Sequence, residues 1–68
     1  MTYQEYLAQS DVLGREMKRI RGLLDQHAEA KEKGVAIEGE LVKKLYEQLN
    51  DVLKRLGDLE QAYWGYLL

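Results

Sequence analysis

The sequence predicts an all-α protein, an antiparallel two-helix hairpin that is expected to dimerise into a four-helix bundle. Three observations lead to this fold class: a heptad repeat of apolar residues in the second half of the chain, a matching repeat in the first half, and a glycine between them. A chain of 68 residues has room for one small core, so residues 1–68 are interpreted as a single helical-hairpin domain.

The second half of the chain carries the strongest repeat, which continues for four heptads from Leu41 to Leu68. Its apolar residues alternate in steps of three and four, the spacing that places side chains along one face of a helix. This face, the second seam, consists of Val42, Leu45, Leu49, Val52, Leu56, Leu59, Tyr63 and Tyr66. We expect the helix to span about residues 38–67, with Glu38 and Glu40 supplying the negative charge that a helix N-terminus favours.

The first half of the chain predicts a helix over about residues 3–33. Thr2 and Glu5 have the spacing of a capping box, which marks the start of a helix. From there the same steps of three and four define a first seam, more polar at its ends: Tyr3, Tyr6, Ser10, Leu13, Met17, Ile20, Leu24, His27 and Lys31.

A turn is predicted over about residues 34–37. Gly34 can adopt the left-handed backbone conformation that ends many helices, and Val35 can then fold back on Ala30. Two helices of about 30 residues joined by so short a connection must lie antiparallel.

Antiparallel packing about this turn opposes the two seams in a constant register. The expected pairs are Leu13 with Leu59, Met17 with Leu56, Ile20 with Val52, Leu24 with Leu49, Ser10 with Tyr63 and Tyr6 with Tyr66. On one flank of the hairpin the same register places Glu16 beside Arg55 and Gln9 beside Ala62. We expect that flank to be polar and to face water.

The other flank carries a row of apolar and small residues that a lone hairpin cannot cover. In the second helix this row consists of Tyr46, Asn50, Leu53, Gly57, Glu60, Trp64 and Leu67, and in the first helix Leu7, Gly14, Arg21 and Ala28 lie beside it. We call the residues of the row that are assigned to a dimer interface the second stripe: Leu7, Gly14, Tyr46, Asn50, Leu53, Gly57 and Leu67. A domain of this size gains only about 3–5 kcal/mol from its own core, and pairing two hairpins would bury the row. The second stripe is therefore the predicted homodimer interface. Within it, Asn50 either fixes the register or lies at a solvated edge, and Gly14 and Gly57 would permit a close approach of backbones.

Aromatic residues are concentrated where the two chain ends are expected to meet. Five of the six lie there: Tyr3, Tyr6, Tyr63, Trp64 and Tyr66. Tyr and Trp are frequent anchors at interfaces because they bury a large area at a low entropic cost. Tyr63 and Tyr66 belong to the second seam and are assigned to the bundle core, whereas Trp64 lies off it. Tyr3, Tyr6 and Trp64 are therefore predicted to bind a partner protein.

The middle of the first helix is locally basic. Arg15, Lys18 and Arg19 are included among the predicted partner-binding residues, and three interpretations of them remain open: a solvated outer face, contact with an acidic patch on another protein, and weak nucleic-acid binding. The net charge of −2 and the pI near 5.3 disfavour nucleic acid or an anionic membrane as the main partner, since both are bound through positive fields.

Residues that carry chemistry are sparse. The chain has no cysteine and one histidine, which lies on the first seam, and neither Thr2 nor Ser10 has a base at a useful spacing. Acidic and basic residues alternate at helical spacing, as expected of a solvated face. We therefore expect no catalytic activity, no cofactor and no metal.

The sequence thus predicts a binding protein. No apolar run approaches a membrane span and the start MTYQEYLAQSD does not resemble a signal peptide, so a cytoplasmic location is expected. The expected function is that of a small non-enzymatic regulator or inhibitor, a homodimer that docks a partner protein through aromatic and apolar residues of its second helix. A structural subunit of a larger helical assembly and a weak nucleic-acid accessory factor are the alternatives. Length and simplicity suggest a bacterial or phage-borne protein.

Overall fold

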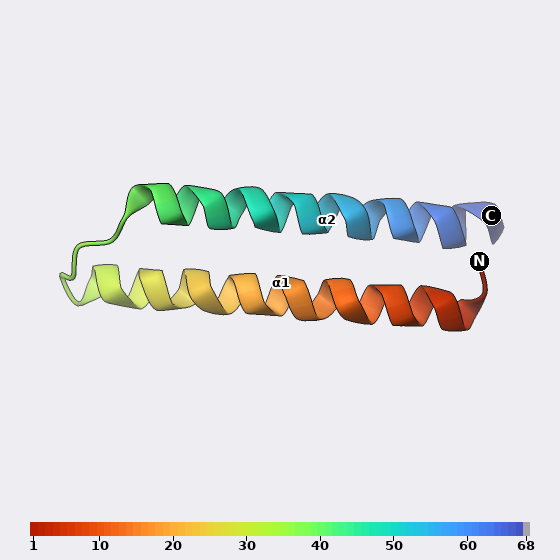
Figure 1. The fold of residues 1–68 in the computed structure, drawn as a ribbon, viewed down its shortest axis with the longest axis horizontal. Helices are drawn as coiled ribbons and strands as arrows, with labels where there is room; N and C mark the ends of the chain where they lie inside the picture. The colour runs from red at the N-terminus through yellow and green to blue at the C-terminus, as the bar shows by residue number, and fades with distance from the viewer. Residues whose placement is uncertain (68) are drawn as a thin grey trace.

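The chain folds into two long antiparallel helices joined by a short turn (Figure 1). The computed structural model describes the backbone of residues 1–67 and the side chains of residues 1–65. Within that part of the chain the elements are α1 (Tyr3–Glu32) and α2 (Gly39–Leu67), and there is no strand. The N-terminus and the end of α2 lie together at the end opposite the turn, which we call the open end. The predicted all-α hairpin is confirmed.

Helix α1 begins and ends with the local signals present in the sequence. The Thr2 hydroxyl accepts a hydrogen bond of 3.1 Å from the Glu5 amide, which satisfies one of the unpaired amides of the first turn. At the other end Gly34 has φ +80°, and the Val35 amide donates to the Ala30 carbonyl over 2.9 Å. This is the bonding pattern of a Schellman motif, so α1 stops at Glu32, one residue before the expected end.

Helix α2 begins without a side-chain cap. The Glu38 carbonyl accepts from the amides of Leu41 and Val42, over 3.1 and 3.3 Å, and Glu40 lies in the first turn. The helix starts at Gly39, one residue later than expected. The start of α2 is therefore defined by backbone hydrogen bonds. Because no side chain caps the helix, the sequence contains no clear signal for its first residue.

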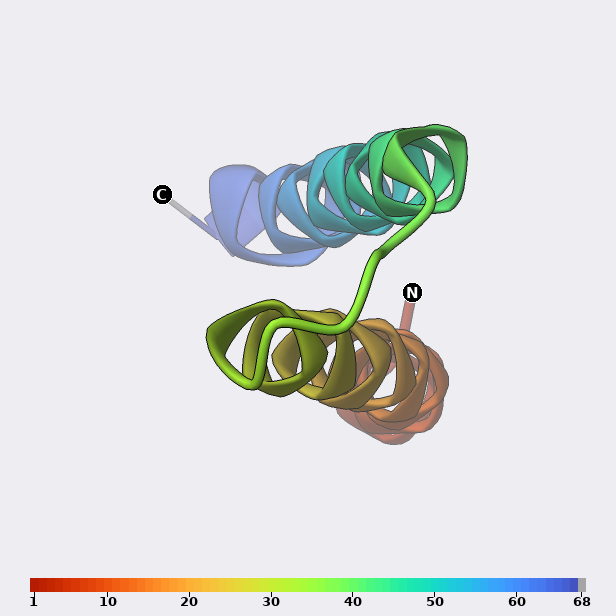
Figure 2. The same ribbon diagram turned by 90° about the vertical axis from the view of Figure 1, so that its left-hand side faces the viewer.

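The two seams face one another and form the core. Figure 2 shows that the helices cross obliquely in the sense of a left-handed supercoil, as a heptad repeat requires. Over residues 1–65, the buried side chains all belong to the predicted seams: Ile20, Leu45, Val52 and Leu59. Leu13, Met17, Leu23, Leu24 and Leu49 are partly buried against them. The core is therefore narrow and runs along the rod, and within residues 1–65 Ile20 is the one completely buried large side chain.

Candidate binding surfaces

The second stripe lies on the surface of the hairpin. Its large apolar side chains remain well exposed, with 45% of Leu7, 54% of Tyr46 and 45% of Leu53 accessible to solvent. Asn50 and Gly57 are exposed as well. The side chain of Leu67, also assigned to this row, lies outside the described residues. Within the described residues, neither helix of the hairpin covers these side chains.

Gly14 and Gly57 both have open space beside them. A Cβ atom added at either position would meet no heavy atom within 4 Å. The close approach expected at these glycines is therefore absent within the chain. Each glycine lies inside a continuous helix, where glycine is about 1 kcal/mol less favourable than alanine. Packing within the hairpin does not explain why glycine occupies these two positions.

The aromatic residues of the open end form one cluster across the two helices. The Tyr6 and Tyr63 ring centroids are 4.7 Å apart, and Tyr3 lies 5.8 Å from Tyr63. Trp64 packs edge-on against Tyr63 at 4.9 Å and against Tyr6 at 6.0 Å. Although Trp64 lies off the seam, the hairpin thus holds one side of its indole, and 44% of the side chain remains exposed.

The ring contacts at the open end differ from the expected pairs. Tyr63 packs on Tyr6, whereas the sequence pairing placed it opposite Ser10. A tyrosine side chain is long and extends along the helix axis, so its ring can contact a residue about one turn away from the position directly opposite. Pairing residues by their numbers alone does not include this reach. Tyr66, which was expected opposite Tyr6, has its side chain outside the described residues.

Glu60 adds a carboxylate to the aromatic cluster. The Tyr6 hydroxyl donates to Glu60 Oε1 over 2.5 Å, across the two helices. This hydrogen bond raises the pKa of the Tyr6 phenol above its ordinary value of 10.0, because deprotonation would remove the donor and set two negative charges side by side. Both side chains are half-buried, so the bond holds the carboxylate beside the rings.

The basic run of α1 is neutralised along its own helix. Arg15 forms an ion pair with Asp11 at 3.1 Å, and Arg19 forms one with Glu16 at 2.6 Å. The hydrogen bond from Arg19 lowers the pKa of the Glu16 carboxyl below its ordinary value. Two of the three basic side chains assigned to partner binding are therefore already paired, and Lys18 is exposed beside them.

The cross-helix pair expected between Glu16 and Arg55 does not form. Arg55 instead binds Asp51, one turn away on α2, over 3.1 Å. Long side chains on exposed helix faces pair with the neighbour three or four residues away because that partner is already within reach.

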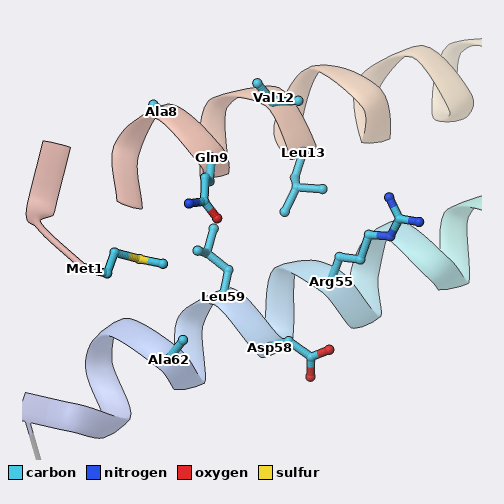
Figure 3. A pocket seen from close by; sticks show the side chains of 9 residues that line it. All are labelled: Met1, Ala8, Gln9, Val12, Leu13, Arg55, Asp58, Leu59 and Ala62. Carbon is cyan, nitrogen blue, oxygen red and sulfur yellow. The ribbon is translucent and has the colours of Figure 1, made fainter. Parts of the chain in front are cut away.

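The flank that was expected to be polar contains an apolar groove near the open end (Figure 3). It has a volume of about 620 Å³ and lies between the first turns of α1 and the second half of α2. Its lining residues are Met1, Ala8, Gln9, Val12, Leu13, Arg55, Asp58, Leu59 and Ala62. Ala8 and Ala62 are too short to cover the edge of the seam, and Val12 is 66% exposed. The i, i+4 spacing of Ala8 and Val12 was the signal in the sequence that could have indicated this groove.

The polar groups with possible chemistry are engaged by their own helix. The Ser10 hydroxyl donates to the Leu7 carbonyl over 3.1 Å, so its proton is engaged by the backbone of α1. His27 Nδ1 lies 2.7 Å from the Leu23 carbonyl oxygen, an atom that can only accept, so Nδ1 carries the proton. Among the described residues no three His, Cys, Asp or Glu side chains come together in a way that could hold a metal ion.

Comparison with known proteins adds no relative. No family model, no curated protein and no solved structure matches the chain. Over the described residues, neither helix combines the length and the apolar character that crossing a bilayer requires. The surfaces themselves are therefore the basis for a functional proposal.

Proposed function

We propose that this protein is a small non-enzymatic regulator or inhibitor that acts as a homodimer and docks a partner protein at its open end. The observation that carries the proposal is the second stripe, a row of large apolar side chains left uncovered by a hairpin with a narrow core. Exposed apolar side chains gathered on one surface are characteristic of sites that bind other proteins.

The surface area of the chain supports the homodimer. A compact monomer of 7.9 kDa is expected to expose roughly 4,400 Å². This rod, 50 × 16 × 15 Å in extent, exposes 5540 Å², about 1,100 Å² more. A stable interface of standard size buries about 800 Å² on each partner, so a second hairpin on the second stripe would remove a comparable area.

The aromatic cluster supports docking of a different protein. Tyr3 and Trp64 offer exposed ring surface, and the rings behind them hold them in place. Preorganised aromatic side chains make efficient anchors because little conformational freedom is lost on binding. The cluster lies at the tip of the rod, which leaves most of the second stripe available to a second hairpin.

A structural subunit of a larger helical assembly is the second candidate. The observation that favours it is the apolar groove on the flank opposite the second stripe, because two apolar faces allow one hairpin to contact two neighbours. Binding of nucleic acid by the basic face is less well supported, since Arg15 and Arg19 are both paired with acids of their own helix.

Affinity capture from an extract of the native cells tests the proposed function. The wild-type protein and a Trp64→Ala variant are immobilised side by side, and the captured proteins are identified. Val35→Ala is the matched control, because Val35 is an exposed apolar residue at the turn end. We expect Trp64→Ala to weaken capture of a specific partner by at least about 2 kcal/mol, the loss typical of a truncated anchor, and Val35→Ala to leave it unchanged.

Two results would count against this assignment. One is equal capture by the wild type and Trp64→Ala. The other is a Trp64→Ala protein that has lost its helical circular dichroism signal, which would make the indole a structural lid of the hairpin.

A further inference from the structure

We infer that the open end recognises a cationic segment, an arginine- or lysine-bearing stretch of the partner protein. This inference rests on the proposed function, because it names the chemistry of the partner docked there. The juxtaposition that carries it is a cluster of exposed rings with a fixed carboxylate, at an end of the rod that has no basic side chain.

The charges of the chain are separated along the rod. Residues 1–14 and 56–68, the parts of both helices at the open end, contain no Lys or Arg. They contain four carboxylates, Glu5, Asp11, Asp58 and Glu60. Asp11 is paired with Arg15, and the three ion pairs among the described side chains include none of the other three acids. The open end therefore presents a negative field although the chain as a whole is only slightly acidic.

Glu60 and Trp64 are one helical turn apart, so they lie on the same face of α2. The hydrogen bond from Tyr6 holds the Glu60 carboxylate beside the Tyr6 ring, and Trp64, whose indole packs edge-on against the same ring, is 44% exposed. A guanidinium or ammonium group placed there would meet the negative face of an aromatic ring and a carboxylate together, so an ion pair would add to the cation–π contact.

The same arrangement discriminates between partners. An acidic segment would bring like charges together without any basic side chain to compensate, and an uncharged apolar segment would have to strip water from Glu60 without a counter-ion. Arginine is expected to bind better than lysine, because its planar guanidinium stacks on rings and can contact a carboxylate through two hydrogen bonds.

Titration with simple charged peptides tests this inference. Oligo-arginine, oligo-lysine and oligo-glutamate peptides of equal length are added to the full chain at low salt, and binding is followed by Trp64 fluorescence and by the amide NMR shifts of α2. We expect oligo-arginine to bind more tightly than oligo-lysine, oligo-glutamate not to bind, and the affected amides to lie around Glu60 and Trp64.

Glu60→Gln and Glu47→Gln are the deciding pair of variants. Glutamine keeps an oxygen that can accept from Tyr6, so Glu60→Gln removes the charge and leaves the hydrogen bond possible. Glu47→Gln removes an exposed acid from the turn half of α2. Glu60→Gln is expected to weaken oligo-arginine binding by about threefold or more, and Glu47→Gln to change it little.

Equal weakening by both variants, or oligo-arginine shifts away from the open end, would overturn the inference. The capture experiment separates this failure from failure of the proposed function. If Trp64→Ala abolishes capture while oligo-arginine does not perturb Trp64, the docking site stands and its cationic occupant is wrong. If Trp64→Ala has no effect on capture, the docking site itself is wrong.

Discussion

Tyr6 is the residue that connects the most features of the open end. The sequence places it on the first seam, and the structure adds contacts to Tyr63, Trp64 and Glu60, so one side chain joins the core, the exposed ring surface and a carboxylate. Sequence reasoning identified Tyr6 as aromatic and near the partner-binding end. It could not identify the hydrogen bond to Glu60, because that contact depends on side-chain rotamers and on the local offset between the helices.

The Tyr6–Glu60 bond predicts a loss of stability at high pH. Because the folded-state pKa of Tyr6 lies above its ordinary value of 10.0, the stabilisation is complete below pH 10.0 and is lost as the pH rises through the folded-state pKa. In a protein labelled with carbon-13 at the tyrosine Cζ, the Tyr6 resonance should titrate above pH 10.0. Glu60→Gln should lower that midpoint, since the negative acceptor is gone, and Tyr46→Phe should not affect it. A Tyr6 midpoint at or below the ordinary value would contradict the hydrogen bond.

At the scale of the helices, the heptad repeat predicted the two helices and the face of each that is buried. Residues spaced by three and four define which face of each helix is covered, and the four side chains that are buried in the described part of the chain lie on those faces. Gly34 predicted the turn because a left-handed φ is favourable only for such a residue. The groove beside Leu59 was missed, because it results from two short alanine side chains that fail to cover a seam, which the repeat does not encode.

Replacing glycines within the helices by alanine tests whether Gly57 lies in a dimer interface. Gly22→Ala and Gly57→Ala both add a methyl group that meets no heavy atom within 4 Å in the hairpin. Each should therefore stabilise its helix by about 1 kcal/mol. If Gly57 contacts a second hairpin, Gly57→Ala should in addition weaken the dimer, so its melting temperature should gain less at high protein concentration than at low concentration.

Gly22→Ala is the control for that measurement, since Gly22 does not belong to the second stripe. Thermal melting followed by circular dichroism at low and high protein concentration distinguishes the two effects. A Gly57→Ala protein that matches Gly22→Ala at both concentrations would remove Gly57 from the interface.

The whole molecule is a long rod with a small hydrophobic core. A few buried residues stabilise two helices of 30 and 29 residues, and the rod exposes more total surface than is expected of a compact protein of the same mass. The charge is divided as well, with an acidic aromatic open end next to a basic middle. These features fit a protein whose long side is covered by a copy of itself and whose tip contacts a different molecule.

The homodimer is the central claim, and sedimentation equilibrium at micromolar concentration tests it most directly. Leu53→Glu places a charge in the second stripe, and Val12→Glu places the same charge in the groove on the opposite flank, so the two variants differ only in the face they alter. A charge buried without a partner destabilises an interface by several kcal/mol. The wild type and Val12→Glu should sediment as dimers, and Leu53→Glu should become monomeric or lose its helical signal. A wild type that sediments as a fully helical monomer, or a dimer dissociated by Val12→Glu and not by Leu53→Glu, would contradict the assignment of the second stripe.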